Sequence, residues 1–378
     1  MDTSKLIDLF EENFAGFGEL GASVCIWQDG AVILSLGDGF WDREKTRKWT
    51  TETRVLIWSA TKGLASACLL HLCGREKIAL TRRVAEFWPE YAKNGKAHTT
   101  LAHVLSHQSG QPALRNHEIK ILEHEQVVEA LARQEPFWNP GSAHGYHART
   151  YGFLVDELVR RISKIHIGAY FRENFAAPLG LDLWIGLPRE LTDEVAPIYA
   201  ARRTREPSEE DPFYAELANP DSLTFQAFST PAGLPVPALM NRPEIRTHVL
   251  PSLGGIGTAE SLARFYYHTF CEPTFFSQER IAEFSATAAS GIDRILRIPT
   301  AFACGFMKDP ISETGHKVRQ LFGPSPAAFG QPGAGGSHAF ADPKNNVAFA
   351  YVMNQMEPGI FPNQKSLRLV RLAYGEDL

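Results

Sequence analysis

Ser59 and Lys62, in the stretch WSATKGLA, stand three residues apart in a segment that predicts the start of a helix. Residues at this spacing share a helix face with Cβ atoms about 5–6 Å apart, so the two side chains can share a hydrogen bond. A serine hydroxyl becomes a good nucleophile when a neighbouring base takes its proton, and a lysine is such a base when burial keeps it neutral. The following residues, GLASACLLHLC, are apolar around nearly the whole helix, which predicts a buried amine. The helix N-terminus adds positive potential that disfavours lysine protonation and stabilises an oxyanion at Ser59.

The same pair also fits a purely structural interpretation, in which Ser59 caps the helix and Lys62 extends its amine to solvent. The pattern S-x-x-K occurs by chance about once in a chain of this length and ordinary composition. Other segments must therefore decide between the two interpretations.

Tyr146 belongs to a second candidate segment, NPGSAHGYHARTYGFLVDELVRR. Pro140 and Gly141 predict a turn, and apolar residues from Tyr151 onward recur at helical spacing, so Tyr146 is expected where a loop meets a helix. A phenol there can relay protons between a nucleophile, a lysine and a leaving group, provided that nearby cations lower its pKa. A tyrosine that only packs on the turn is the alternative.

A third candidate segment is rich in glycine: FGQPGAGGSHAFADP, residues 329–343. Its glycines let a backbone approach a ligand or another chain closely, and a β-rich run follows at once. A strand edge here can offer N–H groups to an acyl oxyanion, although a bulge or a tight turn would use the same glycines.

Strand signals lie near the two ends of the chain, with helix signals between them. ASVCIWQ and AVILSLG flank Asp29-Gly30, a hairpin signal, and residues 337–355 predict two more strands around an Asp-Pro-Lys-Asn-Asn turn. Residues 204–250 are rich in proline and charge and predict a long excursion over the surface, where specificity elements often reside. Helices are predicted at the amphipathic N-terminus and over residues 59–73, 100–106, 123–134, 148–163 and 364–374.

The composition indicates an ordinary globular protein that acts on a small molecule. The 378 residues are 44% hydrophobic and 21% charged, and the net charge of -5 provides no basic surface for a nucleic acid or an anionic membrane. No stretch approaches the roughly 18 apolar residues of a membrane span, and the acidic N-terminus is unlike a secretory signal. Five scattered cysteines without a C-x-x-C motif suit a reducing compartment, so we expect the cytoplasm. The oligomeric state is left open.

Taken in order, Ser59, Lys62, Tyr146 and the glycine-rich segment resemble the serine β-lactamase and penicillin-binding-protein superfamily, and within it the class C-like branch that includes the family VIII carboxylesterases. The stretches TRVLIWSATKGLAS, TTLAHVLSHQSGQP and PSLGGIGTAESLARF also resemble blocks of that branch, so the resemblance covers most of the chain. It implies an α/β sandwich of β-lactamase type, in which an antiparallel sheet is flanked by helices and carries an inserted, mainly helical domain. We expect residues 1–74 and 251–378 to form the sheet domain and residues 75–250 the insertion.

The resemblance also implies roles for individual residues. Ser59 would be the acylated nucleophile, Lys62 its base and Tyr146 the proton shuttle, while the backbone N–H groups of Ser59 and Ala334 would form the oxyanion hole. The glycine strand of such families usually begins with Lys/His-x-Gly, and the matching triplet here is Gln331-Pro332-Gly333. Gln331 carries no charge, whereas a cation at this place helps to hold the tyrosine anionic and to bind a substrate carboxylate.

A second departure from the lactamases lies next to the shuttle. Those enzymes have Tyr-x-Asn, where this chain has Tyr146-His147-Ala148, so the amide that contacts a β-lactam is missing. Both departures favour neutral esters, and we predict a serine hydrolase that cleaves small to medium carboxylic esters through an acyl-enzyme. A β-lactamase, a D-amino-acid peptidase or an acyl transferase with the same residues remains an alternative, as does a catalytically silent binding protein of this fold.

His147 can tune the site or contact a leaving group, or it can be an ordinary hydrogen-bonded loop histidine. His103 and His107 have the i, i+4 spacing of metal ligands but lack a third ligand and the glutamate of metalloproteases, so no metal is predicted. ETGHK, residues 313–317, is interpreted as a loop. The sequence contains no G-x-S-x-G, Walker A or dinucleotide-binding motif, and no cofactor is implied.

Overall fold

An antiparallel sheet of eight strands, built from both ends of the chain, forms the centre of the computed structural model, which describes residues 1–202 and 208–376. The first strand pairs with the last, since Ala22 lies opposite Met353. In spatial order the strands are β2 (Ala31–Gly39), β1 (Gly21–Gln28), β11 (Val347–Met353), β10 (His338–Asp342), β9 (Phe329–Gly330), β8 (Met307–Lys308), β7 (Pro299–Phe302) and β6 (Ala289–Ile292).

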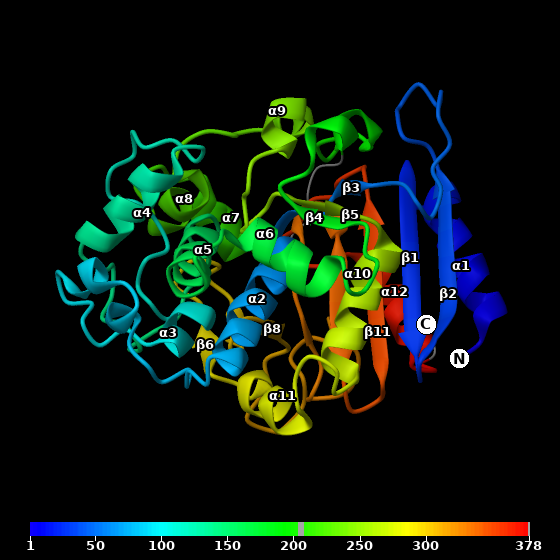
Figure 1. Cartoon of the computed structure of the whole chain (residues 1–378). Helices are drawn as coiled ribbons and strands as arrows, with labels where there is room; N and C mark the ends of the chain where they lie inside the picture. Colours follow the sequence, from blue (N-terminus) through cyan, green and yellow to red (C-terminus); the bar gives the residue numbers. More distant parts are fainter. Residues whose placement is uncertain (203–207, 377–378) are drawn as a thin grey trace.

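Helices cover both faces of this sheet, so its central strands read as continuous apolar runs. Tyr351 on β11 packs edge-on against Phe10 of α1 (Thr3–Ala15). Trp27 on β1 lies opposite Ala348, three residues from Tyr351 and therefore on the other face, where it stacks on Tyr267 at the end of α10 (Ala259–Tyr266). Figure 1 shows α1 and α12 (Gln364–Ala373) on one side of the sheet and α10 on the other.

The remaining helices lie mostly beside the sheet, on the left in Figure 1. A small sheet of β3 (Val55–Leu56), β5 (Gly255–Gly257) and β4 (Leu183–Ile185) lies where the two parts meet. The α-helices not yet named are α2 (Thr61–Arg75), α3 (Leu101–Leu105), α4 (His124–Arg133), α5 (Thr150–Ser163), α6 (Ile167–Phe171), α7 (Asp211–Leu217), α8 (Leu223–Ser229), α9 (Pro243–Arg246) and α11 (Gln278–Ser285). Short 3-10 or π turns are η1 (Trp58–Ala60), η2 (Val84–Glu86), η3 (Pro89–Ala92), η4 (Arg172–Ala176), η5 (Arg189–Glu194), η6 (Pro237–Asn241), η7 (Tyr267–Cys271) and η8 (Ala334–Gly336).

The predicted hairpins and helices are confirmed with shifts of a residue or two. Asp29 and Gly30 both have positive φ, 49° and 85°, which is the turn that an Asp-Gly pair favours between twisted strands. The predicted strands at the C-terminal end are β10 and β11, and α12 follows them. The ETGHK segment lies in the connection between β8 and β9, as predicted.

The prediction for residues 204–250 was wrong in part. Residues 203–207 lie outside the described residues, but the rest contains α7, α8, η6 and α9 and contributes buried side chains such as Phe213, Ala227 and Met240. Prolines at the first turns of α7, η6 and α9 start these elements, so the proline-rich composition that suggested an irregular excursion marks helix beginnings.

The proposed boundaries of the inserted domain stay a prediction. Every strand of the eight-stranded sheet comes from residues 21–39 or 289–353, whereas β4, inside the expected insertion, pairs with β5 outside it. Over the described part of the chain, no helix combines the length and the apolar character needed to cross a bilayer.

Candidate active site

Ser59 lies in a tight turn between β3 and α2. Its predecessor Trp58 has a φ of 49°, a left-handed conformation that is strained for a bulky residue and that marks sites where the surrounding structure fixes the backbone. Ser59 itself is half-buried and belongs to η1, while α2 begins at Thr61. The Ser59 side chain makes no capping hydrogen bond, because the N-cap of α2 is Ala60. The structure therefore rejects the interpretation of Ser59 as a helix cap.

Lys62 is completely buried, and its amine is surrounded by neutral oxygens. Nζ lies 3.1 Å from the Oγ of Ser59 and donates to the carbonyl oxygens of Ala148 at 2.9 Å and Ser252 at 2.8 Å. Burial lowers the pKa of Lys62 well below its usual value, and it pairs with no carboxylate among the described residues that would oppose this shift. A neutral amine that donates its two protons to the carbonyls directs its lone pair at the Ser59 hydroxyl. In this arrangement Lys62 can act as a base toward Ser59.

Tyr146 lies just before α5, as predicted, with its ring buried. The Lys62 Nζ is 4.8 Å from the centroid of this ring, and the Tyr146 hydroxyl is within hydrogen-bonding reach of Ser59. Burial raises the pKa of Tyr146, and the negative charge of Asp293 raises it further. The condition that nearby cations lower the pKa of the phenol is therefore not met. Tyr146 remains a neutral phenol, which can donate a proton.

Gln331 contacts the tyrosine from the strand side of the site. Its buried side-chain amide donates a hydrogen bond of 3.3 Å to the Tyr146 hydroxyl, and its backbone N–H pairs with Ala339 at 2.9 Å. Gln331 therefore contacts the Tyr146 phenol through an uncharged hydrogen bond. It occupies the position at which the family resemblance implies a lysine or histidine.

Gly333 brings the glycine-rich segment against the serine turn. A Cβ at this position would lie 2.3 Å from the carbonyl oxygen of Ile57 and 3.2 Å from the Cβ of Trp58, so only glycine permits the approach. Ala334 follows as the first residue of η8. Within the described chain, the backbone N–H groups of Ser59 and Ala334 have no hydrogen-bond acceptor. They are free to receive an oxyanion.

His147 does not join Ser59, Lys62 and Tyr146. Its ring is completely buried, its Nδ1 donates to the carbonyl oxygen of Gly145 at 2.6 Å, and its Nε2 accepts from the backbone N–H of Gln111 at 3.0 Å. Burial lowers the pKa of His147 to about 3, so the ring is neutral. These contacts are those of a histidine that holds the loop before α5.

His107, considered above as a metal ligand, also supports this loop. Its Nδ1 accepts from the backbone N–H of His147 at 3.1 Å, and its ring lies against Tyr146 with centroids 5.0 Å apart. Burial lowers the pKa of His107 well below its usual value. A neutral imidazole here packs on the tyrosine without adding charge.

Asp293 is a residue that the sequence did not reveal. Its carboxylate accepts from the backbone N–H of Tyr146 at 3.0 and 3.1 Å and from those of Ile295 and Leu296, both at 2.8 Å, and from the hydroxyl of Thr300 at 3.2 Å. The bonds within residues 293–296 form a local turn that an aspartate often makes, but the bond to Tyr146 joins distant segments. Asp293 therefore fixes the backbone at Tyr146.

Ser252 was also missed, although the stretch PSLGGIG was recognised as a family block. Besides its carbonyl contact with Lys62, its Oγ donates to the carbonyl oxygen of Arg149 at 2.8 Å and accepts from the N–H of Gly152 at 2.6 Å. Every residue type has a backbone carbonyl, so the sequence could not reveal the contact between the Ser252 carbonyl and Lys62.

Comparison with known proteins agrees with this geometry. A family model described as Beta-lactamase matches residues 10–372. The chain belongs to the Beta-lactamase family.

The relatives of this chain include esterases and penicillin-binding-protein homologues. Esterase/beta-lactamase LipL of Mycobacterium tuberculosis is 28% identical over 360 residues, covering 93% of this chain and 81% of LipL. The crystal structure of a family VIII carboxylesterase matches with a TM-score of 0.86 and 30% identity, covering 98% of this chain and 96% of that one. A penicillin-binding protein homologue from Caulobacter crescentus gives a TM-score of 0.85 and 31% identity with the same coverage. The β-lactamase-like fold expected from the sequence is thus confirmed.

Two phenylalanine rings lie beside that of Tyr146. Phe302 of β7 stacks on its ring at 6.3 Å, and Phe228 of α8 lies at 6.5 Å. Ala148 contributes a carbonyl to Lys62 and only a methyl group as side chain. Aromatic rings and a neutral amide therefore lie beside the tyrosine.

Proposed function

We propose that this chain is a carboxylesterase that cleaves small to medium esters through an acyl-enzyme at Ser59. The proposal rests on the Lys62 amine, which lies 3.1 Å from the Ser59 Oγ. This amine is completely buried and pairs with no carboxylate among the described residues. The preference for esters is supported by the neutral contact between Gln331 and Tyr146 and by the relatives named as esterases.

Acylation begins when the neutral Lys62 amine takes the Ser59 proton while Oγ attacks the ester carbonyl carbon. The carbonyl oxygen becomes an oxyanion, held by the N–H groups of Ser59 and Ala334. As the carbon–oxygen bond to the leaving group breaks, the Tyr146 phenol gives its proton to the departing alkoxide and regains one from the Lys62 ammonium. An alcohol leaves, an ester on Ser59 remains, and all three side chains return to neutrality.

Deacylation uses the same residues in reverse. A water molecule attacks the acyl carbon, and its proton passes through Tyr146 and Lys62 to the departing Ser59 Oγ. The products are a carboxylic acid and free enzyme. The raised pKa of Tyr146 suits this scheme, because the phenol must be protonated when the leaving group departs.

The test is intact-protein mass spectrometry after treatment with a fluorophosphonate probe, with rates on p-nitrophenyl butyrate and nitrocefin measured in parallel. We expect a single adduct on the wild type, none on Ser59→Ala, and turnover of the ester in preference to nitrocefin. Ser142→Ala is the matched control, because Ser142 is exposed on the loop before Tyr146 and should leave labelling unchanged. An equal adduct on wild type and Ser59→Ala would refute the assignment of the nucleophile.

We also propose the cytoplasm as the compartment. The five cysteines at positions 25, 68, 73, 271 and 304 are free thiols, and burial raises the pKa of Cys25 and Cys73 to about 12. Buried thiols of this kind suit a reducing compartment. Fractionation of the source cells, followed by immunodetection, tests the proposal, and recovery outside the cytoplasm would contradict it.

A further inference from the structure

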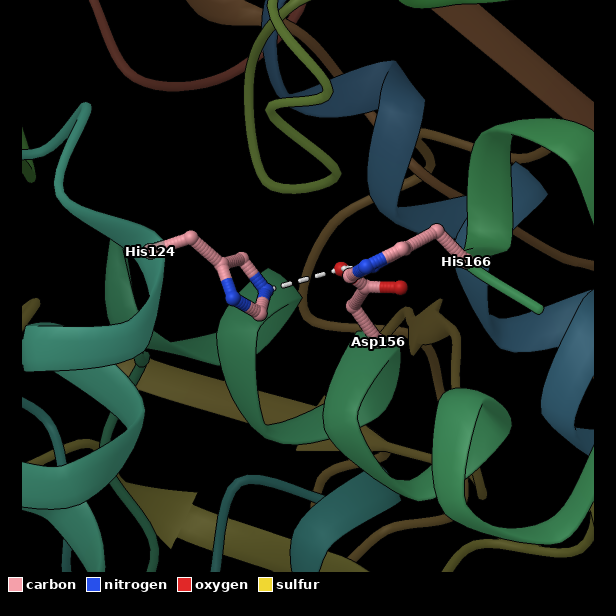
Figure 2. A group of neighbouring side chains, drawn as sticks. All are labelled: His124, Asp156 and His166. Carbon is pink, nitrogen blue, oxygen red and sulfur yellow. Dashed lines mark hydrogen bonds and ion pairs between the residues drawn. The ribbon is translucent and has the colours of Figure 1, made fainter. Parts of the chain in front are cut away.

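Outside the active site, two histidine rings from different parts of the helical region lie within hydrogen-bonding distance of one buried carboxylate. Asp156 lies on α5 and is completely buried. The Nε2 of His124, the first residue of α4, is 2.9 Å from its Oδ2, and the Nδ1 of His166, which precedes α6, is 3.2 Å from the same oxygen. Figure 2 shows both rings directed at this carboxylate.

We propose that His124, Asp156 and His166 form a binding site for a divalent first-row transition metal, with Zn²⁺ as the expected occupant. Two imidazoles and one carboxylate are donors that Zn²⁺ and its neighbours in the series accept, and three protein ligands leave positions for water. The three ligand atoms all lie within 4.8 Å of one another.

The spacing of these atoms suits an ion of this size. Bond lengths of about 2.0–2.2 Å in a tetrahedral site place ligand atoms roughly 3.3 Å apart, and the two nitrogen–oxygen separations are 2.9 and 3.2 Å. The His166 side chain is 50% exposed, so its ring can move to complete the geometry and one side of the site faces solvent.

The surroundings supply the outer contacts that orient metal ligands. Asp156 Oδ1 already accepts a hydrogen bond of 2.8 Å from the backbone N–H of Ile167, which leaves Oδ2 for the ion. The Nδ1 of His124 has no hydrogen-bond partner in the described chain and lies 3.9 Å from an Oε1 of Glu125. When Nε2 binds a metal, the ring proton resides on Nδ1 and can be donated to Glu125, giving a carboxylate–histidine–metal arrangement.

Local charge does not oppose a cation at this place. Asp156 and Glu125 contribute negative charge, while the nearby Arg160 is bound by both carboxylate oxygens of Glu157 at 2.7 and 2.9 Å. The ion would join the beginning of α4 to α5 and to the beginning of α6, so metal binding is expected to stabilise the helical region.

The experiment uses the full chain without a histidine tag, freed of metal by a chelator and titrated with Co²⁺, whose visible absorption reports its coordination. We expect saturation at one Co²⁺ per chain, loss of the absorption on adding Zn²⁺, and a Tm that rises with Zn²⁺. His124→Gln and His166→Gln should each weaken Co²⁺ binding at least tenfold, and Glu125→Gln should weaken it less.

His117→Gln is the matched control, because His117 is exposed elsewhere on the surface and should leave binding unchanged. His166→Gln keeps a side-chain donor for Asp156 and removes a half-exposed ring, so its fold, checked by circular dichroism, should match the wild type. A wild type that shows no saturable Co²⁺ absorption would overturn the proposal. An absorption that persists unchanged in the His124→Gln/His166→Gln double variant would overturn it as well.

Discussion

The side-chain amide of Gln331 and the hydroxyl of Tyr146 are joined by a hydrogen bond of 3.3 Å, so the tyrosine is held without any positive charge from the glycine strand. Together with the neutral amine of Lys62, this contact gives the site a neutral resting state.

Gln331→Lys should shift the substrate preference toward anions. A lysine ammonium beside Tyr146 lowers the pKa of the phenol and attracts a substrate carboxylate. We expect the ratio of kcat/KM for nitrocefin to that for p-nitrophenyl butyrate to rise about tenfold, the effect of roughly 1.4 kcal/mol of differential binding. Because Gln331 is buried, the variant should also have a lower Tm. An unchanged ratio in a folded variant would argue against the role given to this residue.

Lys62→Met should abolish most ester hydrolysis while leaving the protein folded. The loss of the base is expected to reduce kcat about a thousandfold. The free energy of unfolding should change by less than about 2 kcal/mol, because the lost hydrogen bonds are offset by removal of a desolvated amine.

Lys365→Met is the contrasting control for that experiment. Lys365 is also buried, but it pairs with Glu357 at 2.9 Å and with Glu19 at 3.3 Å. Removing it leaves a buried carboxylate unpaired and should cost about 3 kcal/mol of stability with little effect on kcat in the folded fraction. Urea unfolding and steady-state rates separate the two variants, and equal behaviour of the pair would contradict the distinction.

Stability should rise with pH through the titration of Lys62. The folded state holds this amine neutral, with a pKa well below 10.5, whereas the unfolded chain titrates near 10.5. Between these values the unfolded state binds more protons, so the free energy of unfolding increases as the pH rises. Lys62→Met should therefore show a smaller increase between pH 7 and 10 than the wild type in urea unfolding. Ester hydrolysis should be lost at acid pH, where Lys62 becomes protonated.

Asp293→Asn should impair the shuttle rather than substrate binding. The variant weakens the hold on the Tyr146 backbone and removes a negative charge that raises the pKa of the phenol. We expect kcat to fall about tenfold to a hundredfold, KM to change little, and the alkaline limb of the pH–rate profile to move to lower pH.

Asp309→Asn controls for the loss of a buried carboxylate as such. Asp309 accepts from the backbone N–H groups of Leu321 at 2.9 Å and Phe322 at 3.2 Å, and is buried like Asp293. The Asp309→Asn variant should have a lower Tm and an unchanged pH–rate profile. A similar shift of the profile in both variants would remove the case for Asp293 as a positioning residue.

Phe228→Ala should widen the range of acyl groups accepted. The Phe228 ring lies 6.5 Å from that of Tyr146, centroid to centroid, and removing it opens space beside the tyrosine. We expect kcat/KM for p-nitrophenyl octanoate to rise severalfold relative to the butyrate. Phe213→Ala, a change of a buried ring that contacts Phe228 at 5.2 Å, tests whether loosening α7 and α8 alone produces the effect. If it does, Phe228 is not a specificity residue.

Sequence reasoning singled out Ser59, Lys62 and Tyr146, which lie together in the structure, because their residue types and order are themselves the signal. It also found the hairpin at Asp29-Gly30, where local backbone preference and the fold agree. It could not find Asp293, since its bond to Tyr146 depends on how distant segments meet. It could not give the pKa of Tyr146, because burial and charge in three dimensions, not neighbours in the chain, determine that value.

The pairing of β1 with β11 has a consequence for synthesis of the protein. Ser59 and Lys62 leave the ribosome before Gly333 and Ala334 and the strands that hold them. A nascent chain therefore carries its nucleophile without the backbone groups that would receive an oxyanion. Because sheet closure must wait for such distant segments, folding is expected to be slow. The chain would thus be unable to attack esters until the glycine-rich segment has been made and the sheet has closed.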